Sequence, residues 1–208
     1  LAEGDARVES APPGGASSPA AQTRVLRSEA IELLMQAGGR EIASVRTQAP
    51  GTIEFIPTQP NQSRRRLEGE RIWIAYGPEN RIRSLDATNA ATRTDPPRAG
   101  VKPAPPMLTW SKQLRAEFDQ QGRELSELDQ WGDFRYEQGD RRGRAERALF
   151  QTAGNVIRLT GAARFWDTAG SLSAGRIVLD QDTGDIEAEE KVATTREPES
   201  KAQATAVF

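Results

Sequence analysis

A five-residue pattern that returns along the chain constrains the fold more than any other feature of the sequence. The pattern is Gly, any residue, an apolar residue, a charged residue and an aromatic residue, and two of its five copies are weaker. The copies lie at 51–55, 89–93, 132–136, 161–165 and 190–194. In the weaker copies, Asn89 and Glu190 replace the Gly. The spacing indicates a repeat of about 29 residues that two Pro-rich inserts lengthen.

Each copy follows an alternating segment, a tight turn and a second apolar segment. Leu114, Ala116 and Phe118, for example, alternate with charged neighbours, which predicts a strand with one buried and one solvated face. The unit is therefore a strand, a turn, a strand, a kink and a further strand. The expected turns are Gly38-Gly39, Gly77–Asn80, Gln121-Gly122, Ala153-Gly154 and Asp182–Asp185.

Two segments also fit a helix. Ser28–Met35 has a capping residue, helically spaced apolar residues and a Gly stop, and Ser111–Leu128 has apolar residues at helical spacing. We interpret both as strands because the equivalent segments Arg71–Tyr76 and Arg176–Asp180 are short and precede hairpin turns.

The predicted fold is all-β, an elongated two-sheet structure of about five strand-turn-strand repeats. No unit can bury its apolar face alone, so the units stack across an interior and leave unpaired strand edges at both ends. One rung per unit and sheet gives a stack of roughly 24 Å, and separate rungs give a longer one. The expected organisation is a disordered tail (1–22), the repeat domain (23–195) with Pro-rich inserts at 57–66 and 95–106, and a linker or the start of a further repeat (196–208).

The composition excludes much catalytic chemistry. The chain has no His and no Cys, so it lacks an imidazole base, a Cys nucleophile, the usual zinc ligands and a disulfide. Its 28 basic and 30 acidic residues balance, unlike the broad basic face of a nucleic-acid binder. Asp180, Asp182 and Asp185 resemble a glycosidase pair or a calcium loop in composition, but their turn context favours a hairpin. We predict no enzyme, no cofactor, no metal site and no nucleic-acid partner.

Two segments resemble the repeat of the lipopolysaccharide-transport OstA/LptA-like family, which includes LptA, LptC and the N-terminal domain of LptD. Residues 150–165 contain Gly154-Asn155-Val156 followed by alternation, and residues 179–189 contain Asp180 before a Thr-Gly turn. The resemblance extends over about residues 24–195 and lacks its Gly at Glu190. It implies a periplasmic β-jelly-roll ("taco"), with a role in outer-membrane biogenesis, whose apolar groove carries lipopolysaccharide acyl chains. It also implies partners of similar fold joined edge to edge, with a homo-oligomer as an option. The first residue, Leu1, fits a chain with a signal or anchor upstream.

The candidate groove residues are the inward positions of the units. They are Ile53, Phe55, Ile72, Ile74, Tyr76, Leu114, Ala116, Phe118, Phe134, Tyr136, Phe150, Ile157, Leu159, Phe165, Ile177, Leu179 and Ile186. Arg outnumbers Lys 24 to 4, and a guanidinium suits the phosphates of a lipid headgroup. The candidate headgroup residues are Arg64, Arg65, Arg66, Arg141, Arg142 and Arg144.

Two other interpretations remain open at this stage. The inward residues also fit an ordinary closed core, and the Arg clusters also fit solvated loops. A structural β-repeat scaffold that assembles edge to edge without lipid is therefore the alternative function. The sequence alone does not separate a closed core from an open groove, because both need the same apolar alternation.

Overall fold

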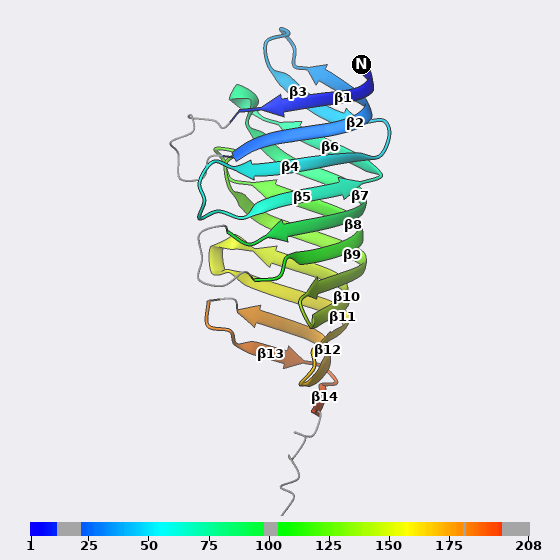
Figure 1. Cartoon of the computed structure of the whole chain (residues 1–208), viewed down its shortest axis with the longest axis vertical. Helices are drawn as coiled ribbons and strands as arrows, with labels where there is room; N and C mark the ends of the chain where they lie inside the picture. Colours follow the sequence, from blue (N-terminus) through cyan, green and yellow to red (C-terminus); the bar gives the residue numbers. More distant parts are fainter. Residues whose placement is uncertain (12–21, 98–103, 181, 197–208) are drawn as a thin grey trace, which may run out of the picture.

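The computed structural model describes residues 1–11, 22–97, 104–180 and 182–196, which form one antiparallel sheet of fourteen strands (Figure 1). The strands are β1 (Ala2–Ser10), β2 (Gln22–Met35), β3 (Ile42–Thr47), β4 (Gly51–Pro57), β5 (Arg64–Gly69), β6 (Arg71–Tyr76), β7 (Ile82–Asp95), β8 (Met107–Phe118), β9 (Leu125–Gln138), β10 (Arg141–Gln151), β11 (Val156–Trp166), β12 (Gly170–Asp180), β13 (Ile186–Glu189) and β14 (Ala193–Arg196). Two single 3-10 turns, η1 (Pro78–Asn80) and η2 (Thr152–Gly154), are the helical elements of these ranges. Within the same ranges no helix has the length and apolar character needed to cross a bilayer.

The sheet is a meander of bent strands. β4 pairs with the first half of β2, and β3 pairs with the second half. In the same way, β6 and then β5 pair with the first and second halves of β7. At the C-terminal end, β14 pairs with the first half of β12 and β13 with the second half. Each of these short pairs therefore acts as one broken strand. Counted in this way, the described residues form eleven rungs, each antiparallel to the next along the chain, stacked along the long axis (Figure 1). At ~4.8 Å per rung the stack is roughly 48 Å long.

All rungs bend at the same place, so the sheet folds into two facing walls joined along a spine. Wall A comprises 6–10, 22–28, β4, β5, 90–95, 107–111, 134–138, 141–145, 163–166, 170–174 and β14. Wall B comprises 31–35, β3, β6, 82–88, 113–118, 125–131, 147–151, 156–160, 176–180 and β13. The hairpin turns lie at the opposite edge of each wall, which we call the mouth.

The predicted kinks lie on the spine. Asn89, Gly132, Gly161 and Glu190 all have positive φ, as the repeat pattern predicts. At Gly132 and Gly161 the strand carries one more residue than its partner, so each is a β-bulge that turns the strand from one wall into the other. The intervening strands bend at ordinary φ.

Gly51 also lies at the spine, but for a different reason from the other kinks. Its φ is not positive; a Cβ there would lie 2.9 Å from a side-chain carbon of Thr47 and 3.0 Å from the carbonyl oxygen of Arg27. The missing side chain lets β3, β4 and β2 meet where the rung is broken.

The predicted all-β, elongated two-sheet fold is confirmed. Ser28–Met35 lies in β2 and Ser111–Leu128 spans β8 and the start of β9, so the helical alternatives are wrong. Each repeat contributes two rungs instead of one, which doubles the length expected from the simpler count.

The expected disordered tail is wrong for residues 2–10. They form β1, which pairs along β2 from Ala2–Ile31 to Ser10–Arg24, because backbone pairing and the inward Ala6 and Val8 hold a segment with few apolar residues. The Pro-rich part of the predicted tail (12–21) and the predicted linker (196–208) lie outside the described residues, except Arg196, which ends β14. Of the two predicted inserts, 57–66 overlaps the ends of β4 and β5, and 95–106 connects β7 to β8.

Candidate functional site

The candidate site is the interior between the two walls. Cross-strand partners lie on the same face of a sheet, so the register defines inward rows that run from rung to rung. One row of wall B is Val45, Ile74, Leu85, Ala116, Leu128, Phe150, Ile157, Leu179 and Ile186. The facing row of wall A is Leu26, Ile53, Leu67, Thr92, Thr109, Tyr136, Gly143, Phe165 and Leu172. The structure places every predicted groove residue on these or the adjacent inward rows.

The interior of the N-terminal half is closed. Its apolar cluster draws on both walls, with Ile53 and Leu67 from wall A facing Ile72, Ile74 and Leu85 from wall B. All of these side chains are at most 4% exposed. These side chains therefore form a packed core between the two walls.

A contact between the walls closes the mouth of this half. Phe55 of wall A stacks on Phe118 of wall B, with ring centroids 6.3 Å apart. Arg24, beside Phe55 on wall A, places its guanidinium carbon 5.7 Å from the Phe118 centroid and donates a hydrogen bond to the carbonyl oxygen of Gly122. We call Arg24, Phe55, Phe118 and Gly122 the clasp.

Arg24 is an unusual residue for a clasp because it is only 5% exposed. Its Nε atom is buried without a hydrogen-bond partner. Burial lowers the pKa of the Arg24 guanidinium, while Tyr76 and the carboxylate of Asp119 partly offset this effect. Burial likewise raises the pKa of the Tyr76 hydroxyl. Through its hydrogen bond to Gly122, the Arg24 guanidinium ties the β8–β9 turn to wall A.

The interior of the C-terminal half has a different character. Four of the seven buried residues in its apolar cluster are alanines, Ala145, Ala148, Ala163 and Ala174. Towards the mouth, the larger inward side chains are only partly buried, and Ile186 on the last rung is 48% exposed. Tyr136 and Phe165 lie 6.3 Å apart on the same wall, on either side of Gly143. No clasp like that of Arg24 is found among the described residues of this half.

A buried polar layer separates the two halves. Thr109 of wall A donates to the Gln130 side-chain oxygen of wall B at 2.9 Å, and the Thr92 and Thr109 hydroxyls lie 2.6 Å apart. Ser111 makes a longer bond to the same Gln130 oxygen at 3.4 Å. The interior is thus two apolar compartments with a hydrogen-bonded layer between them.

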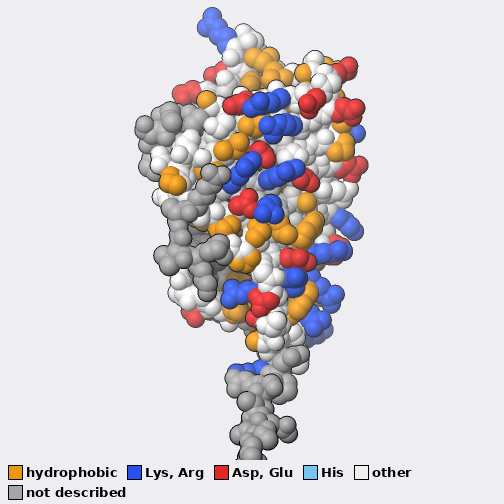
Figure 2. Space-filling view, viewed as in Figure 1, with side chains coloured by type: hydrophobic (Ala, Val, Ile, Leu, Met, Phe, Trp, Pro, Cys, Tyr) orange, Lys and Arg blue, Asp and Glu red, His pale blue; other side chains and the backbone are white. Residues whose placement is uncertain are grey.

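The predicted headgroup arginines divide into two groups. Arg64, Arg66 and Arg142 point outwards and pair with Glu54, Glu68 and Glu137, at 3.1, 2.7 and 3.4 Å. Arg144 is also on the outer face, in register with Arg135 and Arg164. Figure 2 shows basic and acidic side chains interspersed on the face in view.

Only Arg65 and Arg141 lie at the mouth. They share an inward row of wall A that begins at Arg24 and Phe55 and passes through Thr94 and Met107. Both side chains still reach solvent. Nearby groups desolvate Arg65 enough to lower its pKa.

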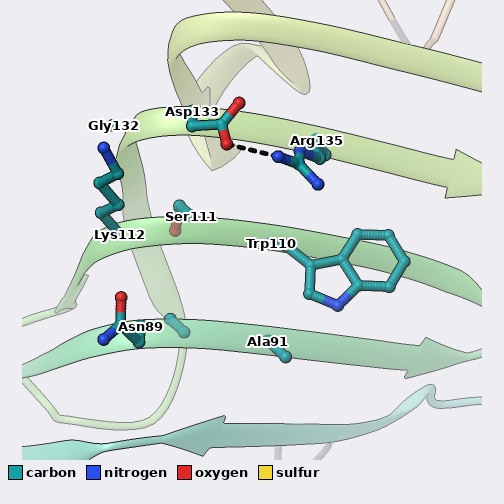
Figure 3. A pocket seen from close by; sticks show the side chains of 9 residues that line it. Asn89, Ala91, Trp110, Ser111, Lys112, Gly132, Asp133 and Arg135 are labelled. Carbon is teal, nitrogen blue, oxygen red and sulfur yellow. Dashed lines mark hydrogen bonds and ion pairs between the residues drawn. The ribbon is translucent and has the colours of Figure 1, made fainter.

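Two hollows outside the interior are of a different kind. One, of about 230 Å³, lies on the spine between Trp110, Lys112 and the ion pair of Asp133 with Arg135 (Figure 3). The other, of about 550 Å³, lies between the β6–β7 and β8–β9 turns and is lined by charged groups that include Arg83 and Glu117. The second is also lined by the inward Ile82 and by Phe118 of the clasp, so it lies against the mouth of the N-terminal half.

The acidic candidates Asp180, Asp182 and Asp185 form the predicted hairpin turn. The Asp180 carboxylate accepts hydrogen bonds from the backbone amides of Asp182 and Thr183, at 2.9 and 3.0 Å, and these bonds lower its pKa. Asp182 accepts a bond from the Asn155 side chain. The Asp180 carboxylate thus holds the turn, and the Asp182 carboxylate joins this turn to Asn155.

Both ends of the stack are open edges within the described residues. β1 covers β2 only as far as Ile31, so the stretch from Glu32 to Met35 pairs on one side alone. Leu33, Leu34 and Met35 are exposed there. At the other end, β13 and β14 pair only with β12.

These features define a class of protein, an elongated folded β-sheet with an apolar interior, a mouth along one side and strand edges at both ends. Residues 107–185, which hold β8 to β12, match the family model of the "LptA/(LptD N-terminal domain) LPS transport protein". The resemblance predicted from the sequence is therefore confirmed over this segment.

One solved structure that matches is the crystal structure of LptH, the LptA homologous periplasmic component of the conserved lipopolysaccharide transport device from Pseudomonas aeruginosa. It is 10% identical, with a TM-score of 0.31, and the match covers 81% of this chain and 96% of that chain. No curated protein matches the chain.

Sequence reasoning missed the clasp and the polar layer. Gln130 had a usable signal, because a Gln sits in an inward position of an otherwise alternating strand. Arg24 had none, since its role depends on a turn almost a hundred residues away in the sequence.

Proposed function

We propose that this protein is a periplasmic component of lipopolysaccharide transport that takes acyl chains between its two walls and passes them to a neighbouring domain. The observation that carries the proposal is the inward row of Phe150, Ile157 and Leu179, which presents partly exposed apolar side chains in the segment that matches the transport family. A ligand for such a row must be apolar, because the inward positions offer hydrocarbon and aromatic surface.

The expected binding energy is adequate for a carrier. Each buried methylene contributes ~0.8 kcal/mol, so a chain of about twelve carbons gains roughly 10 kcal/mol before ordering costs are subtracted. Such binding needs no specific polar contact along the chain. A carrier must also release its cargo, and binding by apolar burial alone lets the chain slide along the row.

The phosphates of the headgroup would meet Arg65 and Arg141 at the mouth. Both guanidinium groups lie on the rim of wall A, while the outward Arg64 and Arg142 are already paired with carboxylates. Guanidinium forks bind phosphate oxygens well, and a solvent-facing rim suits a headgroup that stays in water.

The open edges support assembly with similar domains. Unpaired backbone donors and acceptors at the edge of a sheet accept a further strand. We propose that the edge from Glu32 to Met35 and the β13–β14 edge join neighbouring domains by strand pairing, and that the apolar interior continues across the β13–β14 edge. The partner is another folded sheet of this class or a second copy of this chain.

The test is binding of purified protein to lipopolysaccharide and to the same lipopolysaccharide after removal of its acyl chains, measured by titration calorimetry. We expect binding to the intact lipid and strong weakening by Leu179→Glu, which places a charge on the inward row. Glu117→Gln on the outer face is the matched control and should bind as the parent does. Equal binding of the deacylated molecule, or none of the intact lipid by a folded protein, would contradict acyl binding and favour the scaffold alternative.

The headgroup assignment has its own test. The double variant Arg65→Gln/Arg141→Gln should weaken binding of phosphorylated lipopolysaccharide more than that of dephosphorylated lipid. The control Arg64→Gln/Arg142→Gln changes the same number of charges on the outer face. If the two double variants bind both lipids alike, Arg65 and Arg141 do not bind the headgroup phosphates.

A further inference from the structure

The two walls change character at the same rung. Along wall B, Val45, Ile74 and Leu85 are at most 2% exposed, and Ala116 on β8 is 6% exposed. From β9 onwards every member of the same row is partly exposed or exposed, from Leu128 to Ile186. On wall A, the buried Ile53 and Leu67 give way in the same manner to the partly buried Tyr136, Phe165 and Leu172.

The residues that fill the two halves also differ in size. The N-terminal cluster contains Ile31, Ile53, Ile72, Ile74 and Leu85, whereas four of the seven buried residues of the C-terminal cluster are alanines. Gly143 lies between Tyr136 and Phe165 and adds no side chain to wall A. With smaller side chains between the walls, this half is the part of the interior that a hydrocarbon chain would enter at the lower steric cost.

The boundary between the halves is chemically defined. The layer of Thr92, Thr109, Ser111 and Gln130 presents hydroxyl and amide groups where a sliding chain would have to pass. A chain passing between the walls here would have to break the bond of Thr109 to Gln130 and would offer these buried groups no replacement, which is unfavourable. The layer therefore ends the apolar row on the side of β8.

We infer that the acyl-binding site of this protein is confined to its C-terminal half, from β9 to β13, and that the clasp keeps the N-terminal half closed as a structural core. This inference rests on the proposed function, and it specifies where in the interior the chain is held. The occupant is a saturated hydrocarbon chain of an amphiphile that enters from the mouth or from the open β13 end. The segment matched by the transport family, β8 to β12, contains most of this half.

Phe55 and Phe165 allow a matched test. Both are half-buried inward residues of wall A, and each lies 6.3 Å from one other aromatic ring. A photoreactive benzoylphenylalanine is placed at one position or the other, and the full chain is irradiated with purified lipopolysaccharide. We expect several-fold more lipid crosslinked at position 165 than at position 55, and none at the outward position 110.

The outcomes separate the two proposals. Equal crosslinking at positions 55 and 165 would overturn the confinement and leave acyl binding intact. No crosslink at either position, in protein that is folded by circular dichroism, would overturn the proposed function itself.

The clasp has a second test in the same background. With the photoreactive residue at position 55, Arg24→Ala should raise lipid crosslinking several-fold, because the turn at Gly122 is released from wall A. The control is Arg27→Ala, on the outward face of the same strand, and should leave the crosslink unchanged. If Arg24→Ala raises crosslinking no more than Arg27→Ala, the clasp does not close the N-terminal half.

Discussion

Gly122 and Gly184 both adopt positive φ in hairpin turns, yet only Gly122 is pressed against another strand. A Cβ at Gly122 would lie 2.8 and 2.9 Å from backbone atoms of Ile82, whereas nothing lies within 4 Å of one at Gly184. Gly122→Ala is expected to cost about 3 kcal/mol, from both backbone strain and the clash, and Gly184→Ala about 1 kcal/mol from strain alone. Urea unfolding measures both, and equal losses would contradict the tight approach of the β8–β9 turn.

The Asp180 carboxylate makes one turn sensitive to acid. Hydrogen bonds from the amides of Thr183 and Asp182 lower its pKa in the folded state, so its stabilising effect is present above the unfolded pKa and is lost as the pH falls through the folded value. Asp180→Asn should therefore destabilise the protein at neutral pH and have less effect in acid below pH ~4. Unfolding midpoints measured across this range, with Asp185→Asn as the control in the same turn, test the expectation.

Residue identities predicted the turns better than the contacts between walls. The Asp-Thr-Gly-Asp turn is determined by neighbours in the sequence, so its chemistry is visible there. The clasp is not, because Arg24 meets Gly122 only after the sheet has folded over. Nor does the sequence distinguish Arg65 from Arg64, which lie next to each other but on opposite faces of β5.

At the scale of the strand, the bulge at Gly161 provides a double-mutant test. A Cβ at Gly161 would lie 2.6 Å from the Cβ of Glu146 across the spine, and φ there is +78°. Gly161→Ala should cost roughly 3 kcal/mol. Glu146→Gly removes the atom that the new methyl group meets, so adding it should recover part of that loss, leaving the cost of the strained φ. Purely additive losses in thermal unfolding would show that the two residues do not meet.

The repeat predicted the strands because its kink positions lie on the spine at every second rung, and at Gly132 and Gly161 they are bulges. It could not predict the bends at the intervening rungs, such as that near Glu146, because they use ordinary φ and any residue type. β1 escaped prediction for a related reason: Gly4 and Asp5 form its kink, but the segment lacks the apolar and aromatic residues of the other copies.

At the scale of the whole molecule, assembly should depend on the exposed edge of β2. Leu34→Lys places a charge where a neighbouring strand would pair, and charged edge residues oppose such pairing. We expect the variant to remain folded and to lose concentration-dependent association in sedimentation experiments, alone or with a partner of the same fold. Trp73→Ser, which removes an exposed ring from the outer face of a central strand, is the control. Association that survives Leu34→Lys would place the interface elsewhere.

The overall shape could be predicted from the alternation of apolar and charged residues, which requires two faces and a shared interior. The difference between the halves of that interior could not, because it depends on which alanines line up across the walls and on a Gln that meets a Thr from the opposite wall. Those relations appear only when the register of all rungs is fixed.

The meander has a consequence for the length of the molecule. Every rung pairs with its neighbours in the sequence, and equivalent bulges recur at Gly132 and Gly161. Excising residues 132–160 would join the first half of β9 to the second half of β11 and restore one bent strand with the correct direction on both sides. The molecule would shorten by two rungs, roughly 10 Å, without any rewiring of the chain. A fold built in this way can act as a spacer whose span is adjustable in fixed steps by duplicating or deleting a single repeat.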